Sequence, residues 1–184
     1  MPGFSSARDR KASLQRMRHI LQNRLSIEFE RSGRPLALVS DIYNYRPVSP
    51  DLATSGQPDE EELAAIAATG FQVIVNIALH DDPRYSLPDE AGSVRALGLE
   101  YIHIPVVFTA PTARDLEQFF DVMDRVSDRK VWVHCAANKR VSTFLGLYWH
   151  LRRGQPREQA FALMRSVWEP NEVWAAFVAE RIGG

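Results

Sequence analysis

Cysteine is scarce in this chain, because its 184 residues include a single one, Cys135. One cysteine allows no disulfide within the chain, which fits a reducing compartment, and we expect a cytoplasmic protein. No stretch approaches the roughly 18 consecutive apolar residues of a membrane span, so no span is expected. The first residues, MPGFSSARDRKAS, carry charges without an apolar core behind them, so we do not expect a secretory signal.

Excess charge of one sign is also lacking, because 22 lysines and arginines oppose 23 aspartates and glutamates, for a net charge of −1. Such a balance gives no general attraction to nucleic acid, and no nucleic-acid partner is expected. The histidines show no ligand spacing beside the single cysteine, which argues against a metal site. No dinucleotide-binding fingerprint or Walker loop occurs, so no cofactor is expected.

What is present is the composition of a soluble globular protein, with 45% hydrophobic and 24% charged residues. The length predicts one domain with a terminal extension. We place the extension at residues 1–34, where eight Lys or Arg oppose three Asp or Glu. Within it, apolar residues at a spacing of three or four predict a basic amphipathic helix over 8–31. The remaining residues, 35–184, form the predicted α/β domain.

Strand and helix signals alternate along this second part of the chain. β-rich runs with turn residues between them predict strands over 36–40, 45–48, 52–55, 71–78, 99–105 and 130–134. Periodic apolar residues with caps and glycine stops predict helices over 59–69, 89–97, 112–126, 141–153, 156–167 and 171–182.

Strands that alternate with helices in this way imply parallel strand–helix–strand units. We therefore predict an α/β fold with a largely parallel central sheet flanked by helices. In such a sheet the ligand lies beyond the carboxyl ends of the strands. The segment that follows the strand ending at His134 is therefore the first place to look for chemistry.

That strand runs directly into a short loop and then into a helix. A loop of this kind exposes several backbone N–H groups beside the positive end of the helix dipole, which together bind an anion of phosphate size. Arg140 adds a planar fork for two phosphate oxygens. The same positive field favours the thiolate of Cys135, which is the nucleophilic form. The predicted phosphate-binding residues are Ala136, Ala137, Asn138, Lys139 and Arg140.

A cysteine beneath such a loop can attack phosphorus in line and form a thiophosphate intermediate. Ser142 would then hydrogen-bond the thiolate and ease its departure, and His134 would hold the strand end and the cysteine. Taken alone, Cys135 also fits a buried inert thiol, and Ser142 also fits a helix-capping serine. The combination of His, Cys and Arg at a strand-to-helix junction favours a catalytic loop instead.

The His-Cys…Arg…Ser loop resembles the signature of the cysteine-dependent protein tyrosine phosphatases, in particular their bacterial dual-specificity-phosphatase-like branch. Segments 48–58, 70–77 and 98–105 follow the order of that family, and the resemblance covers about residues 40–180. It implies a protein tyrosine phosphatase-like fold and phosphomonoester hydrolysis through a cysteinyl-phosphate intermediate. The implied substrate is a phosphoprotein or a small phosphate ester, with aryl phosphates favoured.

The sequence departs from the family signature in two places. The signature has five residues between Cys and Arg, whereas Arg140 comes one residue early while Ser142 keeps its usual spacing. The family also places an aspartate, the general acid, in the loop after the strand equivalent to 101–105, but residues 106–111 contain no carboxylate. Asp82 is the candidate acid that remains, because Asp115 has the position of a helix-capping partner.

Two other functions fit parts of the pattern. A rhodanese-like sulfurtransferase often has the shorter spacing of four residues between Cys and Arg that is found here. A phosphate-binding module would keep the loop but need no general acid. His134, Ser142 and the upstream segments favour the phosphatase over both.

Overall fold

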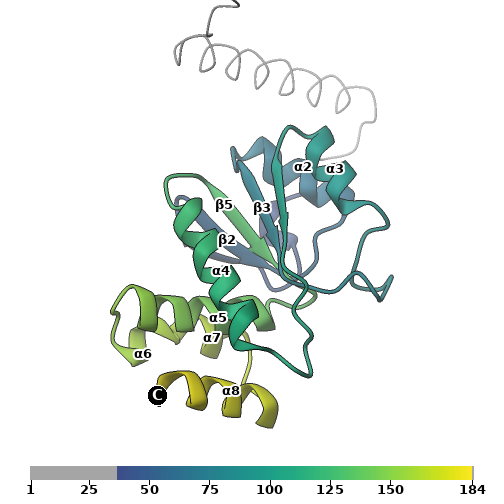
Figure 1. Ribbon diagram of the computed structural model, residues 1–184. Coiled ribbons are helices and arrows are strands. Elements are labelled where there is room, and N and C mark those ends of the chain that lie inside the picture. The colour runs from purple at the N-terminus through teal and green to yellow at the C-terminus, as the bar shows by residue number, and fades with distance from the viewer. Residues whose placement is uncertain (1–36, 184) are drawn as a thin grey trace, which may run out of the picture. The chain divides into compact units, whose positions relative to one another are not determined.

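The structure, a computed structural model, describes residues 37–183 and has a five-stranded sheet at its centre (Figure 1). The strand order is β1-β2-β5-β3-β4, with β1 antiparallel to β2 and every other neighbouring pair parallel. The predicted α/β fold with a largely parallel sheet is confirmed. The strands are β1 (Arg46–Ser49), β2 (Leu52–Ser55), β3 (Val73–Asn76), β4 (Glu100–His103) and β5 (Val131–His134). The helix predicted over 8–31 lies outside the described residues.

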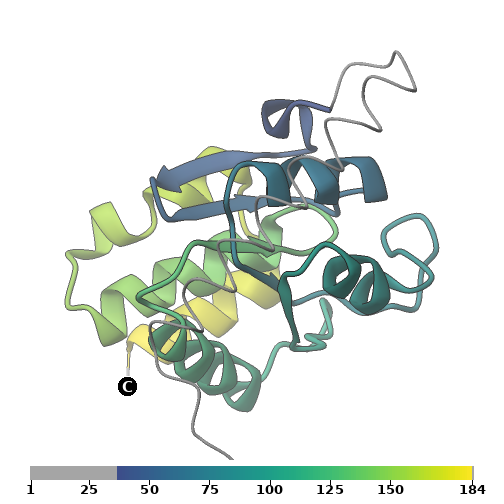
Figure 2. The same ribbon diagram turned by 90° about the horizontal axis from the view of Figure 1, so that it is seen from above.

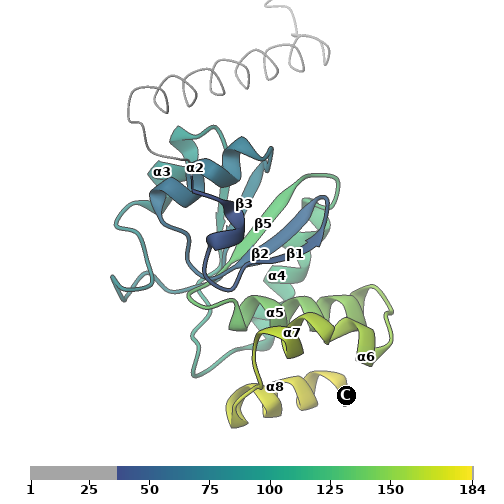
Figure 3. The ribbon, with the colours of Figure 1, turned by 180° about the vertical axis from the view of Figure 1, so that it is seen from behind.

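Helices lie on both sides of the sheet, as Figures 1 and 3 show. On one side are α2 (Glu60–Ala68) and α3 (Glu90–Ala96). On the other side, α4 (Ala113–Arg125) and α5 (Lys139–Leu147) pack on the sheet, and Figure 2 shows α8 in yellow beside the green α5. The remaining helical segments are η1 (Val39–Asp41), the π-helix η2 (Tyr148–Arg152), α6 (Arg157–Ala160), α7 (Ala162–Val167) and α8 (Glu172–Ile182). Among residues 37–183, no helix is long and apolar enough to cross a membrane.

The two hydrophobic clusters of the core follow from the alternation of side chains along the central strands. On β5, Val131 and Val133 belong to the cluster with α4, α5 and α8, whereas Trp132 belongs to the cluster with α2 and α3. Cys135 continues the first set and is 1% exposed. His134, one residue earlier, therefore faces the opposite side of the sheet from Cys135.

Three predicted elements differ from the structure. The sequence predicts a strand over 36–40, but residues 37–40 belong to no strand of the sheet. The N–H of Asp41 instead donates to the carbonyl of Leu38 in a 3₁₀ turn, η1, so this backbone bonds locally. The helix predicted from residue 141 begins two residues earlier, and it changes to the π-helix η2 at residue 148. The helix predicted over 156–167 divides at Phe161 into α6 and α7.

The capping box predicted at the start of α4 is confirmed. The Thr112 side chain accepts a hydrogen bond from the N–H of Asp115 at 3.1 Å, and the Asp115 carboxylate accepts one from the N–H of Thr112 at 3.0 Å. These reciprocal bonds satisfy two N–H groups that the helix itself cannot pair. They fix the point at which the loop after β4 enters the helix.

Thr112→Ala is therefore expected to lower the free energy of unfolding by about 1 kcal/mol, because it removes the cap of α4. Urea unfolding followed by circular dichroism measures the change. Thr109→Ala, at an exposed threonine in the same loop, is the matched control and should unfold like the wild type. Equal stability of the Thr112 variant and this control would contradict the capping role.

Candidate active site

The predicted phosphate-binding loop leaves the central strand β5 and leads into α5 at Lys139. The N–H of Cys135 donates to the carbonyl of Ser55 at the end of β2, and Ala137 forms an isolated bridge with Gly56. The loop is thus anchored on the neighbouring strand at the carboxyl edge of the sheet. Cys135 lies at its base, packed in the core cluster beneath α5.

Asn138 gives the loop its bend. It is the residue before α5 and has a left-handed backbone conformation, with φ of 62°, which asparagine tolerates better than most residues. Its side-chain amide donates to the carbonyl of Asn44 and to the hydroxyl of Thr54, each at 2.8 Å. The Asn44 amide in turn donates to the carbonyl of Ala137 at 3.1 Å. The sequence predicts Asn138 as a phosphate-binding residue, which stays a prediction, and the structure adds that its side chain positions the loop.

Arg140 reaches from α5 to the loop that follows β4. Its Nη1 donates to the carbonyl of Val106 at 2.7 Å, and its guanidinium lies 5.7 Å from the ring centre of Phe108. The side chain is buried, and among the described residues its Nε has no hydrogen-bond partner. Val141 occupies the usual position of the signature arginine and is fully buried in the same core cluster as Cys135. The early arginine therefore contacts the loop at 106–111 rather than the core.

Ser142 and Lys139 lie in the first turn of α5. The Ser142 hydroxyl donates to the carbonyl of Lys139 at 3.1 Å, and its predicted bond to the Cys135 thiolate stays a prediction. The Lys139 ammonium lies 5.3 Å from the ring centre of Trp168, so its side chain packs on an aromatic surface next to the loop.

Asp82, the candidate general acid, is paired within its own loop. Its carboxylate accepts hydrogen bonds from the guanidinium of Arg84 at 2.7 to 3.2 Å. These hydrogen bonds are the main reason why the pKa of Asp82 is lowered from its usual value. A lowered pKa favours the carboxylate over the acid form, which opposes a role as proton donor. The role of Asp82 stays a prediction.

A buried polar network on the other face of the sheet was missed by the sequence analysis. The fully buried carboxylate of Glu90 lies 2.7 Å from Nε2 of His134, which is also fully buried. The same carboxylate accepts hydrogen bonds from the amide of Asn76 at 2.7 Å and the hydroxyl of Tyr101 at 3.2 Å. The only signal in the sequence was a second acidic residue at the start of the helix predicted over 89–97, where an acidic residue normally stays in solvent.

This network keeps Glu90 ionised. Burial raises the pKa of Glu90, but the charge of His134 and hydrogen bonds from His134, Gln57 and Asn76 outweigh it and lower the pKa to about 2. A carboxylate with a lowered pKa in the folded state stabilises the protein above its unfolded pKa.

No group of three His, Cys, Asp or Glu residues within 37–183 is arranged to hold a metal ion.

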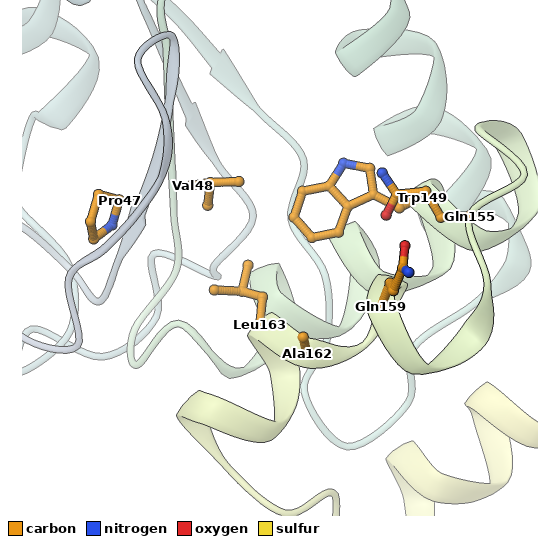
Figure 4. A pocket seen from close by; sticks show the side chains of 7 residues that line it. All are labelled: Pro47, Val48, Trp149, Gln155, Gln159, Ala162 and Leu163. Carbon is orange, nitrogen blue, oxygen red and sulfur yellow. The ribbon is translucent and has the colours of Figure 1, made fainter.

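A separate pocket of about 300 Å³ lies between β1 and the segment from η2 to α7 (Figure 4). None of its lining residues belongs to the loop or to the buried network, so it is distinct from the candidate site. Those residues are Pro47, Val48, Trp149, Gln155, Gln159, Ala162 and Leu163.

A single cysteine at the base of a strand-to-helix loop, at the carboxyl edge of a largely parallel sheet, is the arrangement of the protein tyrosine phosphatase fold. The profile of a family described as a DSP-PTPase phosphatase fused to NAD⁺ kinase matches residues 44–173. The match covers more than half of the chain, and the chain belongs to this family.

Solved structures support the same fold. A DUF442 protein of Shewanella putrefaciens CN-32 is 29% identical, with a TM-score of 0.69 over 79% of this chain and 95% of that one. TpbA of P. aeruginosa, solved in complex with pTyr, is 16% identical, with a TM-score of 0.61 over 81% of this chain and 91% of that one. The second likeness shows the fold alone.

A curated relative matches a shorter stretch. The beta-lactamase hydrolase-like protein of Xylella fastidiosa strain Temecula1 is 32% identical over 91 residues. That stretch is 48% of this chain but only 21% of the relative, so this chain matches about a fifth of the relative's length.

The ionisation of Glu90 predicts how stability changes with pH. Its folded pKa of about 2 lies below the ordinary 4.5, so its stabilising effect is complete above about pH 5 and is lost as pH falls toward 2. Glu90→Gln should lower the free energy of unfolding by roughly 3 kcal/mol at pH 7, because it removes the buried carboxylate that His134, Asn76 and Tyr101 contact. Urea unfolding of both proteins at a series of pH values measures the difference, which should shrink in acid. A difference that does not change with pH would contradict the assignment.

Proposed function

We propose that this chain hydrolyses phosphate monoesters through a cysteinyl-phosphate intermediate on Cys135, with aryl phosphates as the favoured substrates. The observation that carries the proposal is the position of Cys135 at the base of the strand-to-helix loop, whose bend Asn138 holds through hydrogen bonds to Asn44 and Thr54. Arg140 follows in the first turn of α5. Membership of the DSP-PTPase family supports the same reaction.

In the first step, the Cys135 thiolate attacks phosphorus, a sulfur–phosphorus bond forms, and the bond from phosphorus to the ester oxygen breaks. The backbone N–H groups of the loop and the guanidinium of Arg140 would stabilise the charge that develops on the phosphoryl oxygens. The Arg140 Nε, which is buried and has no partner among the described residues, is the donor available for this task. In the second step, water attacks phosphorus, and inorganic phosphate leaves as the thiolate is restored. Ser142 would assist this departure.

The loop at 106–111 contains no carboxylate that could protonate the leaving oxygen. Loss of general acid catalysis typically costs about 10²–10⁴-fold in rate. The cost falls most heavily on alkoxide leaving groups, which are strong bases, and least on activated phenolates. This difference supports aryl phosphates as the favoured class of substrate.

The nucleophile is tested by Cys135→Ser. The variant should lose p-nitrophenyl phosphate turnover by at least about 10³-fold, because the serine hydroxyl is not ionised at neutral pH and is a weak nucleophile. It should still bind vanadate in isothermal titration. Thiosulfate treatment of the wild type, followed by mass spectrometry, tests the sulfurtransferase alternative. A persulfide on Cys135 without phosphate release would contradict the proposal, and so would a wild type that binds vanadate without any turnover.

The absence of an acid predicts a steep dependence of rate on the leaving group. For a series of aryl phosphates, log kcat/KM of the wild type should fall steeply as the pKa of the released phenol rises, because its oxygen leaves without a proton. Asp82→Asn should have the same slope, as should Asp81→Asn, the matched control at the neighbouring carboxylate. A shallow slope in the wild type that becomes steep only in Asp82→Asn would identify Asp82 as the acid.

A further inference from the structure

Glu90 is a buried charged group to which the proposed reaction gives no role. It belongs to α3, on the opposite face of the sheet from Cys135, and its carboxylate is completely shielded from solvent. One oxygen lies 2.7 Å from His134 Nε2. The other oxygen accepts from Asn76 at 2.7 Å and lies 3.4 Å from His80 Nε2. Four groups from β3, β4, β5 and the loop after β3 therefore converge on one carboxylate, since the Tyr101 hydroxyl also donates to it.

Burying a carboxylate has a large energetic cost, and replacing such ion pairs by apolar residues is often neutral or even stabilising. A fully apolar set of side chains in place of Glu90 and its partners would serve the fold as well, whereas removal of Glu90 alone would leave those partners buried without the carboxylate. The side chains of Glu90 and His134 are both fully buried and lie 2.7 Å apart. Stability alone does not require a buried carboxylate at this place. A role of Glu90 in positioning the loop that begins at Cys135 would account for it.

The connection to the loop runs through the backbone of β5. The His134 ring and the Cys135 thiol are attached to adjacent residues that point to opposite faces of the sheet. The carbonyl of His134 accepts from the N–H of Ile77 at 3.0 Å, and the Asn76 side chain accepts from the N–H of Ala78 at 2.7 Å. Glu90, by binding both His134 and Asn76, holds the carboxyl ends of β5 and β3 together at the residue where the loop begins.

We propose that Glu90 is a positioning residue for the Cys135 nucleophile. Its carboxylate fixes the orientation of the His134 ring and thereby the peptide from which the thiol projects toward the loop. A thiol misplaced by about 1 Å would lose in-line alignment with phosphorus at a cost of up to about 10²-fold in rate. The proposal rests on the proposed function for its kinetic consequences, but the placement of the thiol can be measured without turnover.

The test compares Glu90→Gln with the wild type at a temperature where circular dichroism shows both to be folded. Glu90→Gln should lower kcat for p-nitrophenyl phosphate by about 10-fold to 100-fold and change KM by less than about twofold, because phosphate binding by the loop amides is retained. The rate of Cys135 alkylation by iodoacetamide should fall in parallel. Asp89→Asn, at the exposed N-cap of the same helix, is the control for loosening of α3 and should leave both readouts near the wild-type values.

Tyr101→Phe provides a second, milder variant, because it removes one hydrogen bond to Glu90 without changing any buried charge. It should lower kcat and the alkylation rate in the same direction by a smaller factor. If Glu90→Gln and Tyr101→Phe are folded and both keep wild-type kcat and alkylation rates, Glu90 has only a structural role and the proposal is wrong. If the wild type shows no turnover, the proposed function fails, while the alkylation rates still decide the role of Glu90.

Discussion

The alternation of side chains along β5 is the constraint on which the site depends. This central strand is buried on both faces, so each of its residues must have a partner in one of two cores. Val133 and Cys135 take the side of α4 and α5, whereas Trp132 and His134 take the side of α2 and α3. The Cys135 thiol therefore packs among apolar side chains on the side of α4 and α5. The polar network of Glu90 and His134 lies on the opposite side of the same strand end.

The early position of Arg140 can be understood from how α5 packs on the sheet. The signature position of the arginine, six residues after Cys135, is taken by Val141, which is buried in the same core cluster as Cys135. Arg140 lies one position around the helix and bonds instead to the Val106 carbonyl. The guanidinium thus connects the predicted phosphate-binding loop with the loop after β4. Helix α8 also holds the loop after β4, because the Trp174 indole donates to the carbonyl of Phe108.

Features with a local cause could be predicted from the sequence. The capping box at Thr112 needs only residues three apart, and the strand that leads into Cys135 needs only a run of β-branched and aromatic residues. The strand predicted over 36–40 was wrong because the N–H of Asp41 bonds locally to the carbonyl of Leu38, and whether a short apolar run joins a sheet depends on the tertiary arrangement. The buried position of Glu90 could not be predicted from the sequence either, because it depends on a contact between distant parts of the chain. Its contact with His134 spans 44 positions along the chain and arises only when α3 packs on the sheet.

Trapping the covalent intermediate would show directly whether Cys135 carries the phosphoryl group. The wild-type protein is mixed with p-nitrophenyl phosphate, quenched in acid within the first turnovers, and digested for mass spectrometry. The peptide containing Cys135 should gain the mass of one phosphoryl group, and no other peptide should gain it. Phosphate release without any phosphorylated Cys135 peptide, or with the phosphoryl group on another residue, would contradict it.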